Sequence, residues 1–259
     1  MFRRAPQNFA DVKEGHCMEQ IYTIPVNEAF SAMLEEGGEV KCRCPFCEMH
    51  SRLEENEIDR ILGAAMMEPD VRIRTNEVGF CDKHFTRMLG GKNRLGLALI
   101  LESHLDELKN KIKGGSLFGK SGASVVKTLD TLEHSCYVCE RIETNFSRMI
   151  ATAVMLWERD TEFGEKFRAQ SCFCLPHYQR MLAYAQAKLP KKIFARFYEE
   201  ASEIENAYLE KIKEDVSWFC KKFDYRYEAE PWNGAKDAPE RAIAMLSSEK
   251  HPQDKISRP

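Results

Sequence analysis

The sequence predicts an all-α protein built from two homologous helical repeats and a long C-terminal helix. Apolar residues recur every three or four positions over much of the chain, which is the period of amphipathic helices. The stretch from Cys44 to Phe85 is matched, nearly position for position, by the stretch from Cys136 to Tyr178. That match predicts an internal duplication.

The first repeat is expected over residues 18–113. Asn27 predicts the N-cap of a short helix, and Pro45 fits the first turn of a longer one. Acids, Glu54 among them, stand between the apolar positions of that longer helix. Val71 to Glu77 are expected to form a short, partly extended return, and leucines in register predict a further helix after it.

The second repeat is expected over residues 126–228, after a flexible, glycine-rich linker at 114–125. It has a helix from Cys136 and includes the long C-terminal helix that Pro190 opens. Apolar residues in that last helix are spaced close to a heptad seam. Such a seam is more often intramolecular core, but a homodimer through it is left open. Residues 229–259 lack periodicity and are expected to form a mobile tail.

Composition places the chain among ordinary globular proteins. Of its 259 residues, 43% are apolar and 31% are charged, and the formal net charge is -3. Because acids and bases are interspersed, no overall basic field would attract nucleic acid or an anionic membrane. The longest apolar run, at 95–101, is far shorter than the roughly 20 residues of a membrane span. We expect neither a nucleic-acid partner nor a membrane span.

Residues 1–17 are expected to form a loose leader. They hold two arginines but lack the apolar segment and small-residue cleavage site of a secretory signal. We therefore expect a cytoplasmic protein, in which thiols stay reduced. Ten cysteines in short paired spacings then indicate metal ligands or redox groups rather than disulfides.

Each repeat carries one CxxC and one CxxH motif. CPFC is followed after 33 residues by CDKH, and CYVC is followed after 34 residues by CLPH. Three thiolates and one imidazole form a donor set that Zn²⁺ accepts in a closed tetrahedral site. Buried core cysteines alone would not explain why the histidines recur. The eight predicted metal ligands are Cys44, Cys47, Cys81, His84, Cys136, Cys139, Cys174 and His177.

Two pairings of these motifs would give each ion four ligands. We favour pairing within each repeat, because a partly extended return can bring the CxxH back to the CxxC. A swapped arrangement, in which each CxxC meets the CxxH of the other repeat, stays open. Two zinc ions are the expected cofactors, since iron-sulfur clusters use three cysteines and one histidine less often. His50 lies near the first motif and is expected to be solvated.

Five short segments carry a family resemblance. They are IYTIPVN at 21–27, CPFC, EPDVR at 68–72, GFC at 79–81 with the histidine that follows, and NRLG at 93–96. These segments resemble an uncharacterised bacterial family catalogued only as a domain of unknown function. The resemblance covers roughly residues 18–225 and implies no established activity. The chain departs from it at Cys172, which stands where the first repeat has Gly79.

The motifs predict a metal-binding helical protein that acts as a structural or protein-interaction module, with another protein as its partner. No Ser-His-Asp set, carboxylate pair or cofactor loop is discernible, so a hydrolase or a nucleotide-dependent enzyme is not expected. The alternative is a thiol-redox or iron-sulfur protein that uses the same cysteines. CPFC has the lettering of a dithiol active site, although such sites normally follow a strand.

Overall fold

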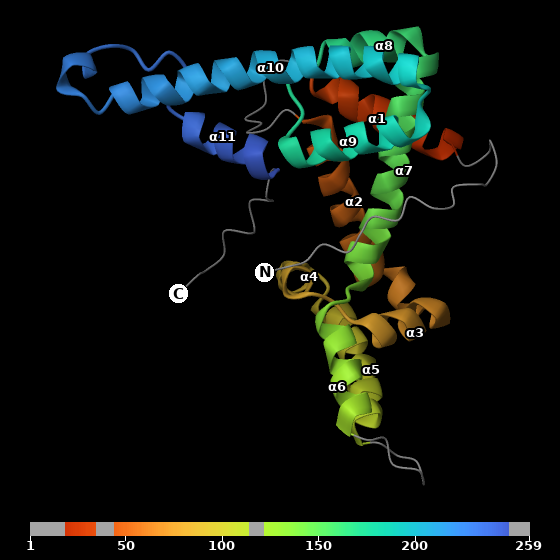
Figure 1. The fold of residues 1–259 in the computed structure, drawn as a ribbon. Coiled ribbons are helices and arrows are strands. Elements are labelled where there is room, and N and C mark those ends of the chain that lie inside the picture. The colour runs from red at the N-terminus through yellow and green to blue at the C-terminus, as the bar shows by residue number, and fades with distance from the viewer. Residues whose placement is uncertain (1–18, 35–43, 114–121, 249–259) are drawn as a thin grey trace.

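A computed structural model describes residues 19–34, 44–113 and 122–248. The predicted leader and the linker residues 114–121 lie outside this part of the chain. The described residues form only helices, with no strand among them, which confirms the all-α prediction (Figure 1). No described helix is long and apolar enough to cross a membrane. The α-helices are α1 (Glu19–Ala32), α2 (Pro45–Leu62), α3 (Pro69–Val78), α4 (Asp82–Gly90), α5 (Arg94–Lys113), α6 (Gly122–Glu133), α7 (Tyr137–Arg159), α8 (Thr161–Arg168), α9 (Leu175–Lys188), α10 (Lys191–Lys221) and α11 (Ala238–Ser247).

The order of elements runs twice along the chain. In each half a long helix begins after a CxxC cysteine, a short helix follows it, and a third helix begins after a CxxH cysteine. These helices are α2, α3 and α4 in the first half and α7, α8 and α9 in the second. Val71 to Glu77 therefore lie in a helix, α3, and the expectation of a partly extended return is wrong. Common ancestry of the two halves stays a prediction.

Helices α2 and α7 pack side by side and run in opposite directions (Figure 1). Arg60, near the end of α2, donates a hydrogen bond of 2.6 Å to the hydroxyl oxygen of Tyr137, at the start of α7. Phe46, at the start of α2, packs instead on Phe146, further along α7, with ring centroids 6.4 Å apart. Each half also places its first helix against the other half, because α1 packs on α7 and α8 and α6 packs on α3.

A cluster of aromatic rings lies in the core around Phe30 of α1. Its ring centroid lies 5.7 Å from that of Phe46 and 4.8 Å from that of Phe163. Phe167 and Phe173 complete the cluster, and all five rings are at most 1% exposed. Burial of an aromatic side chain contributes on the order of 2 kcal/mol or more. The cluster joins the N-terminal helix to α2, to α8 and to the segment before α9.

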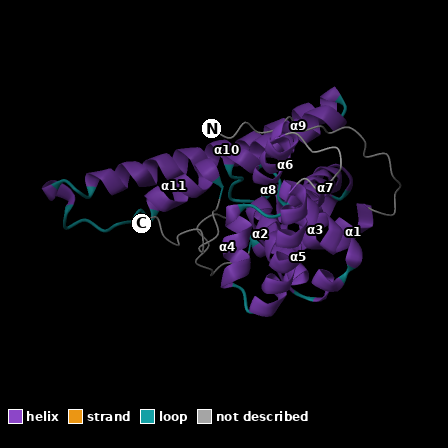
Figure 2. Ribbon diagram, turned by 90° about the horizontal axis from the view of Figure 1, so that it is seen from below, coloured by secondary structure: helices purple, strands orange, loops and turns teal. Residues whose placement is uncertain are grey.

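Helix α10 holds its apolar stripe against its own chain. Its first half packs on α8 and α9, and its second half packs on α11. Figure 2 shows α10 and α11 extending together away from α1, α3 and α5. The predicted mobile tail is wrong where α11 lies, because Ala235, Ala238 and Met245 are buried beside Ile212 of α10. Small alanines make this contact, so the segment shows little apolar periodicity in the sequence.

Two expectations about helix ends are also wrong. Asn27 is not an N-cap, because α1 is continuous from Glu19 and contains Pro25. Proline removes one hydrogen bond from a helix, but Val26 and Ala29 beside it are fully buried, and their packing outweighs that loss. At the predicted linker, α6 already begins at Gly122.

Candidate metal centre

The eight predicted ligands gather into two clusters of four. In each cluster the four ligand atoms lie within 4.8 Å of one another, close enough to hold one metal ion. Each cluster combines a CxxC of one half with the CxxH of the other, so the favoured pairing within each repeat is wrong and the swapped one is found. Site A consists of Cys44, Cys47, Cys174 and His177, and site B consists of Cys81, His84, Cys136 and Cys139.

The opposed directions of α2 and α7 explain the swap. Each CxxC lies at the start of one of these helices, so the two motifs lie at opposite ends of the pair. Helix α2 has 18 residues and carries the chain about 27 Å from its own CxxC. The ten residues of α3 span only about 15 Å and cannot bring it back. The CxxH at α4 therefore meets the CxxC at the start of α7.

Four helix starts position the ligands. The first cysteine of each motif is the N-cap residue, with extended backbone, and the second ligand follows three residues later on the same side of the first turn. The free backbone N-H groups and the positive end of the helix dipole favour thiolate over thiol at such a place. The N-cap cysteines are Cys44, Cys81, Cys136 and Cys174.

The distances at site A fit a single tetrahedral ion. Around zinc, with Zn-S bonds of about 2.3 Å and Zn-N bonds of about 2.0 Å, neighbouring sulfurs lie about 3.8 Å apart and sulfur lies about 3.5 Å from nitrogen. The Sγ atoms of Cys47 and Cys174 lie 3.5 Å apart. Nδ1 of His177 lies 3.1 Å from Sγ of Cys174, 3.5 Å from that of Cys47 and 3.8 Å from that of Cys44.

Site B has the same dimensions. Nδ1 of His84 lies 3.2 Å from Sγ of Cys81, 3.2 Å from that of Cys136 and 3.4 Å from that of Cys139. The Sγ atoms of Cys81 and Cys139 lie 3.8 Å apart. In each site the histidine therefore turns Nδ1 toward all three sulfurs, which leaves Nε2 for a second interaction.

At site B that second interaction is made by a buried carboxylate. Oε1 of Glu54 lies 2.9 Å from Nε2 of His84, and the same carboxylate forms ion pairs with Lys83 and Arg87. Burial alone would raise the pKa of Glu54, but hydrogen bonds from His84 and Lys83 lower it well below its ordinary value. Glu54 is thus ionised at neutral pH, and the stability that it contributes is lost only as the pH falls below about 4.

Without a metal, site B holds a proton on its histidine. Burial alone would lower the pKa of His84, but hydrogen bonds with Cys136 and Cys81 raise it to about 11. Hydrogen bonds from Cys136 and Cys139 lower the pKa of the Cys81 thiol. A metal on Nδ1 would replace the proton there, while Nε2-H stays bonded to the carboxylate of Glu54, which fixes the ring and makes it a stronger ligand.

Aromatic rings surround the histidine of site A instead. The ring centroid of Phe146 lies 5.0 Å from that of His177. The guanidinium carbon of Arg180 lies 4.9 Å from the same Phe146 centroid. His50, expected to be solvated, packs its ring 5.4 Å from that of Phe146. Burial, and then the nearby His177, lower the pKa of His50 to about 4, so this ring is neutral at pH 7.

Sequence reasoning missed the role of Glu54. It stood in the sequence as one of several acids in a helix, yet only 2% of its surface is exposed. Its position in the sequence could have indicated that Glu54 is buried, because Glu54, Ile58 and Ile61 follow the i, i+4, i+7 spacing of the buried stripe. Both of those isoleucines are buried, so an acid in this register indicates a buried partner.

A family model covers most of the chain. The family described as "Family of unknown function (DUF6062)" matches residues 17–253, which include all eight clustered residues. The chain belongs to this family. The match confirms the resemblance to a family of unknown function. Searches of curated proteins and of solved structures find no match for this DUF6062 chain.

Replacing Glu54 with glutamine is expected to weaken metal binding at site B of the DUF6062 chain by about 10- to 100-fold. The amide cannot accept from His84 with the strength of a carboxylate, and it removes the negative charge beside Lys83 and Arg87. Competition with a chromophoric chelator measures the change. Asp59→Asn is the matched control, since Asp59 is an exposed acid of the same helix. Equal affinities in the two variants would contradict the assigned role of Glu54.

Proposed function

We propose that this protein is a zinc-binding structural protein in which two Cys₃His centres join the halves of one chain. The observation that carries the proposal is the composition of each cluster, with two ligands from each half. An ion in site A would tie the start of α2 to the start of α9, and an ion in site B would tie α4 to α7. Binding of this kind contributes directly to folding, by on the order of 10 kcal/mol in small zinc-finger peptides.

The close spacing of the ligand atoms favours one ion over an iron-sulfur cluster. Ligands of a cluster bind different iron atoms and must stand further apart than ligands of one ion. Here all four ligand atoms of a site lie within 4.8 Å of one another. Four protein ligands also leave no open position for substrate, which supports a structural role. A cytoplasmic location is part of this proposal, because reduced thiols are needed to bind the metal.

Elemental analysis of protein purified without oxygen tests the metal assignment. We expect two zinc ions per chain and a colourless protein, because Zn²⁺ has a filled d shell. Iron with acid-labile sulfide, together with absorption in the visible range, would replace this proposal with the iron-sulfur alternative. Metal-free protein with a reducible CxxC disulfide would replace it with thiol-disulfide exchange.

The hairpin of α5 and α6 offers a surface for a protein partner. From residue 101 to residue 135, no side chain in the described part of the chain is fully buried. Leu105 and Ile112 of α5 and Val126 and Leu129 of α6 are 42 to 67% exposed. His104 and Lys111, which precede Leu105 and Ile112, face α3 and its C-terminal end. Successive residues of a helix point about 100° apart, so Leu105 and Ile112 lie to one side of this contact. We call these four side chains the hairpin strip.

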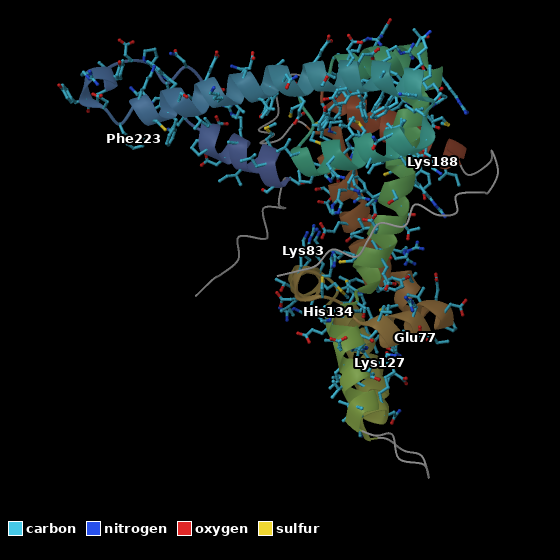
Figure 3. All side chains as sticks on the ribbon, viewed as in Figure 1. Glu77, Lys83, Lys127, His134, Lys188 and Phe223 are labelled. Carbon is cyan, nitrogen blue, oxygen red and sulfur yellow. The ribbon has the colours of Figure 1, made fainter. Side chains whose placement is uncertain are left out.

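Charge along the hairpin supports a second copy of the chain as this partner. Its acids lie mostly toward the body of the molecule, Lys109 and Lys111 lie near the other end of α5, and Lys127 lies near the middle of α6, where Figure 3 labels it. Two hairpins packed in opposite directions would set the lysines of each against the acids of the other. The acids are Glu102, Asp106, Glu107, Asp130 and Glu133, and the lysines are Lys109, Lys127 and Lys111, which is paired with Glu107 of the same helix.

Val126→Glu is expected to turn a dimer into a monomer, because it places a charge among the apolar side chains that the contact would bury. Sedimentation velocity over a range of protein concentrations measures the change. Ile243→Glu, at an exposed position of α11, should leave the dimer intact. A wild-type monomer at all concentrations would contradict the self-association. A dimer dissolved by Phe223→Glu and not by Val126→Glu would place the contact on the C-terminal helix.

A further inference from the structure

The two sites differ in their access to solvent. At site A all four ligand residues are buried, and Cys44 and Cys174 have no exposed surface. At site B Cys139 is exposed and Cys81 is half-buried. Site B therefore has one ligand residue that is open to solvent, whereas site A has none.

Matched positions in the two halves surround the sites with different chemistry. Ten residues after the first cysteine of its CxxC, α2 has Glu54 and α7 has Phe146. The phenylalanine ring covers the histidine of site A. The carboxylate at site B brings two cations with it, and one of them, Lys83, is 41% exposed (Figure 3). Site A is thus enclosed by rings, whereas site B lies under a charged surface.

We propose that site B is an oxidation site for peroxides, at which the sulfur of Cys139 reacts first and the metal ion is then released. The inference rests on the proposed metal binding at both sites. It assigns the two centres different tasks. Site A holds its ion permanently, and site B gives up its ion when its thiolates are oxidised.

The reaction balances with hydrogen peroxide as the only oxidant. The Cys139 thiolate attacks one peroxide oxygen, the O-O bond breaks, and sulfenic acid forms with release of hydroxide. A neighbouring thiolate then attacks the sulfenic sulfur, an S-S bond forms, and a second hydroxide leaves. Two sulfurs lose one electron each and the peroxide gains two. Cys81 and Cys136 are both close enough to be the second sulfur, since each lies within 4.8 Å of Cys139.

Release of the ion follows from the loss of two of its four ligands. A disulfide sulfur carries no negative charge and binds zinc poorly, because the thiolate is the metal ligand. The remaining thiolate and His84 cannot hold a structural ion by themselves. Since site B joins α4 to α7, its loss would loosen that end of the molecule, where the hairpin strip lies. The aromatic cluster and site A lie at the other end of the α2 and α7 pair and would stay intact.

Zinc release under hydrogen peroxide tests the proposal on the intact, fully metallated chain. A chromophoric chelator reports the released ion, and peptide mapping by mass spectrometry locates the disulfide. We expect one ion per chain to leave at least about ten times faster than the other, with Cys139 in the first disulfide. Reductant followed by zinc should restore two ions per chain. Cys220→Ser, which removes the exposed cysteine of α10, should release its first ion at the wild-type rate.

Other outcomes would overturn the inference. Equal release rates, earlier oxidation of Cys44, Cys47 or Cys174, or two retained ions under peroxide would each do so. These results differ from failure of the proposed function, because in that case the untreated protein would hold no zinc. If the first zinc ion leaves more slowly from Cys220→Ser than from the wild type, the reaction with peroxide belongs to Cys220 instead. Phe146→Leu keeps site A apolar but removes the ring over His177. In this variant we expect zinc to leave site A faster under peroxide, so that the release rates of the two sites become more alike.

Discussion

Cys174→Ser is expected to remove the ion of site A and to lower the free energy of unfolding by on the order of 5 kcal/mol, which corresponds to a fall in Tm of roughly 10 to 20 °C. Serine is a poor zinc ligand, and the site is fully enclosed, so water cannot take the fourth position easily. The change also leaves Cys44 and Cys47 buried without the ion that neutralises their charge. Chemical denaturation and zinc analysis measure both effects.

Pairs of substitutions then tell which ligands share an ion. If Cys47 and Cys174 bind one ion, Cys47→Ser adds little to the loss caused by Cys174→Ser, because the ion is already gone. Cys139→Ser acts on the other ion, and its cost should add to that of Cys174→Ser. The opposite pattern would show pairing within each repeat. Cys220→Ser, outside both clusters, should change stability little and serves as the control.

Phe30→Ala is expected to lower the free energy of unfolding by about 3 to 5 kcal/mol. The ring is fully buried among four other phenylalanines, so its removal leaves a cavity that rigid neighbours cannot fill. Two of these neighbours, Phe46 and Phe173, lie beside ligands of site A. We therefore also expect faster loss of zinc from site A than in the wild type.

Denaturation with urea and zinc release to a chelator measure the two effects of Phe30→Ala. Phe223→Ala is the matched control, since that ring is 76% exposed at the end of α10. A Phe30 variant as stable as the Phe223 variant would contradict the placement of α1 against α8. Loss of stability with unchanged release of zinc would separate the aromatic cluster from site A.

Much of the fold could be predicted from local patterns. The segments that form α2, α5, α7 and α10 carry regular apolar spacing, and a helix is expected from the sequence at each of them. The eight residues that form the two sites could be predicted because CxxC and CxxH recur at nearly equal separations. The short spacing within each motif places two ligands on one helical turn, whatever the rest of the chain does.

The pairing of the motifs could not be predicted in the same way. Both arrangements use the same residue types at the same spacings, and the choice depends on how α2 and α7 pack, which is a long-range property. Glu54 was missed because a buried acid is recognised by its partners, and His84 and Arg87 lie about 30 residues further along the chain. Helix α11 was missed because alanines fill its contact with α10.

Anomalous diffraction at the zinc absorption edge tests the central claim most directly, since it locates each ion relative to the side chains. We predict two peaks per chain, one between Cys44, Cys47, Cys174 and His177 and the other between Cys81, His84, Cys136 and Cys139. A peak that joins Cys44 and Cys47 to Cys81 and His84, or the absence of any peak from crystals of protein purified without oxygen, would contradict the account.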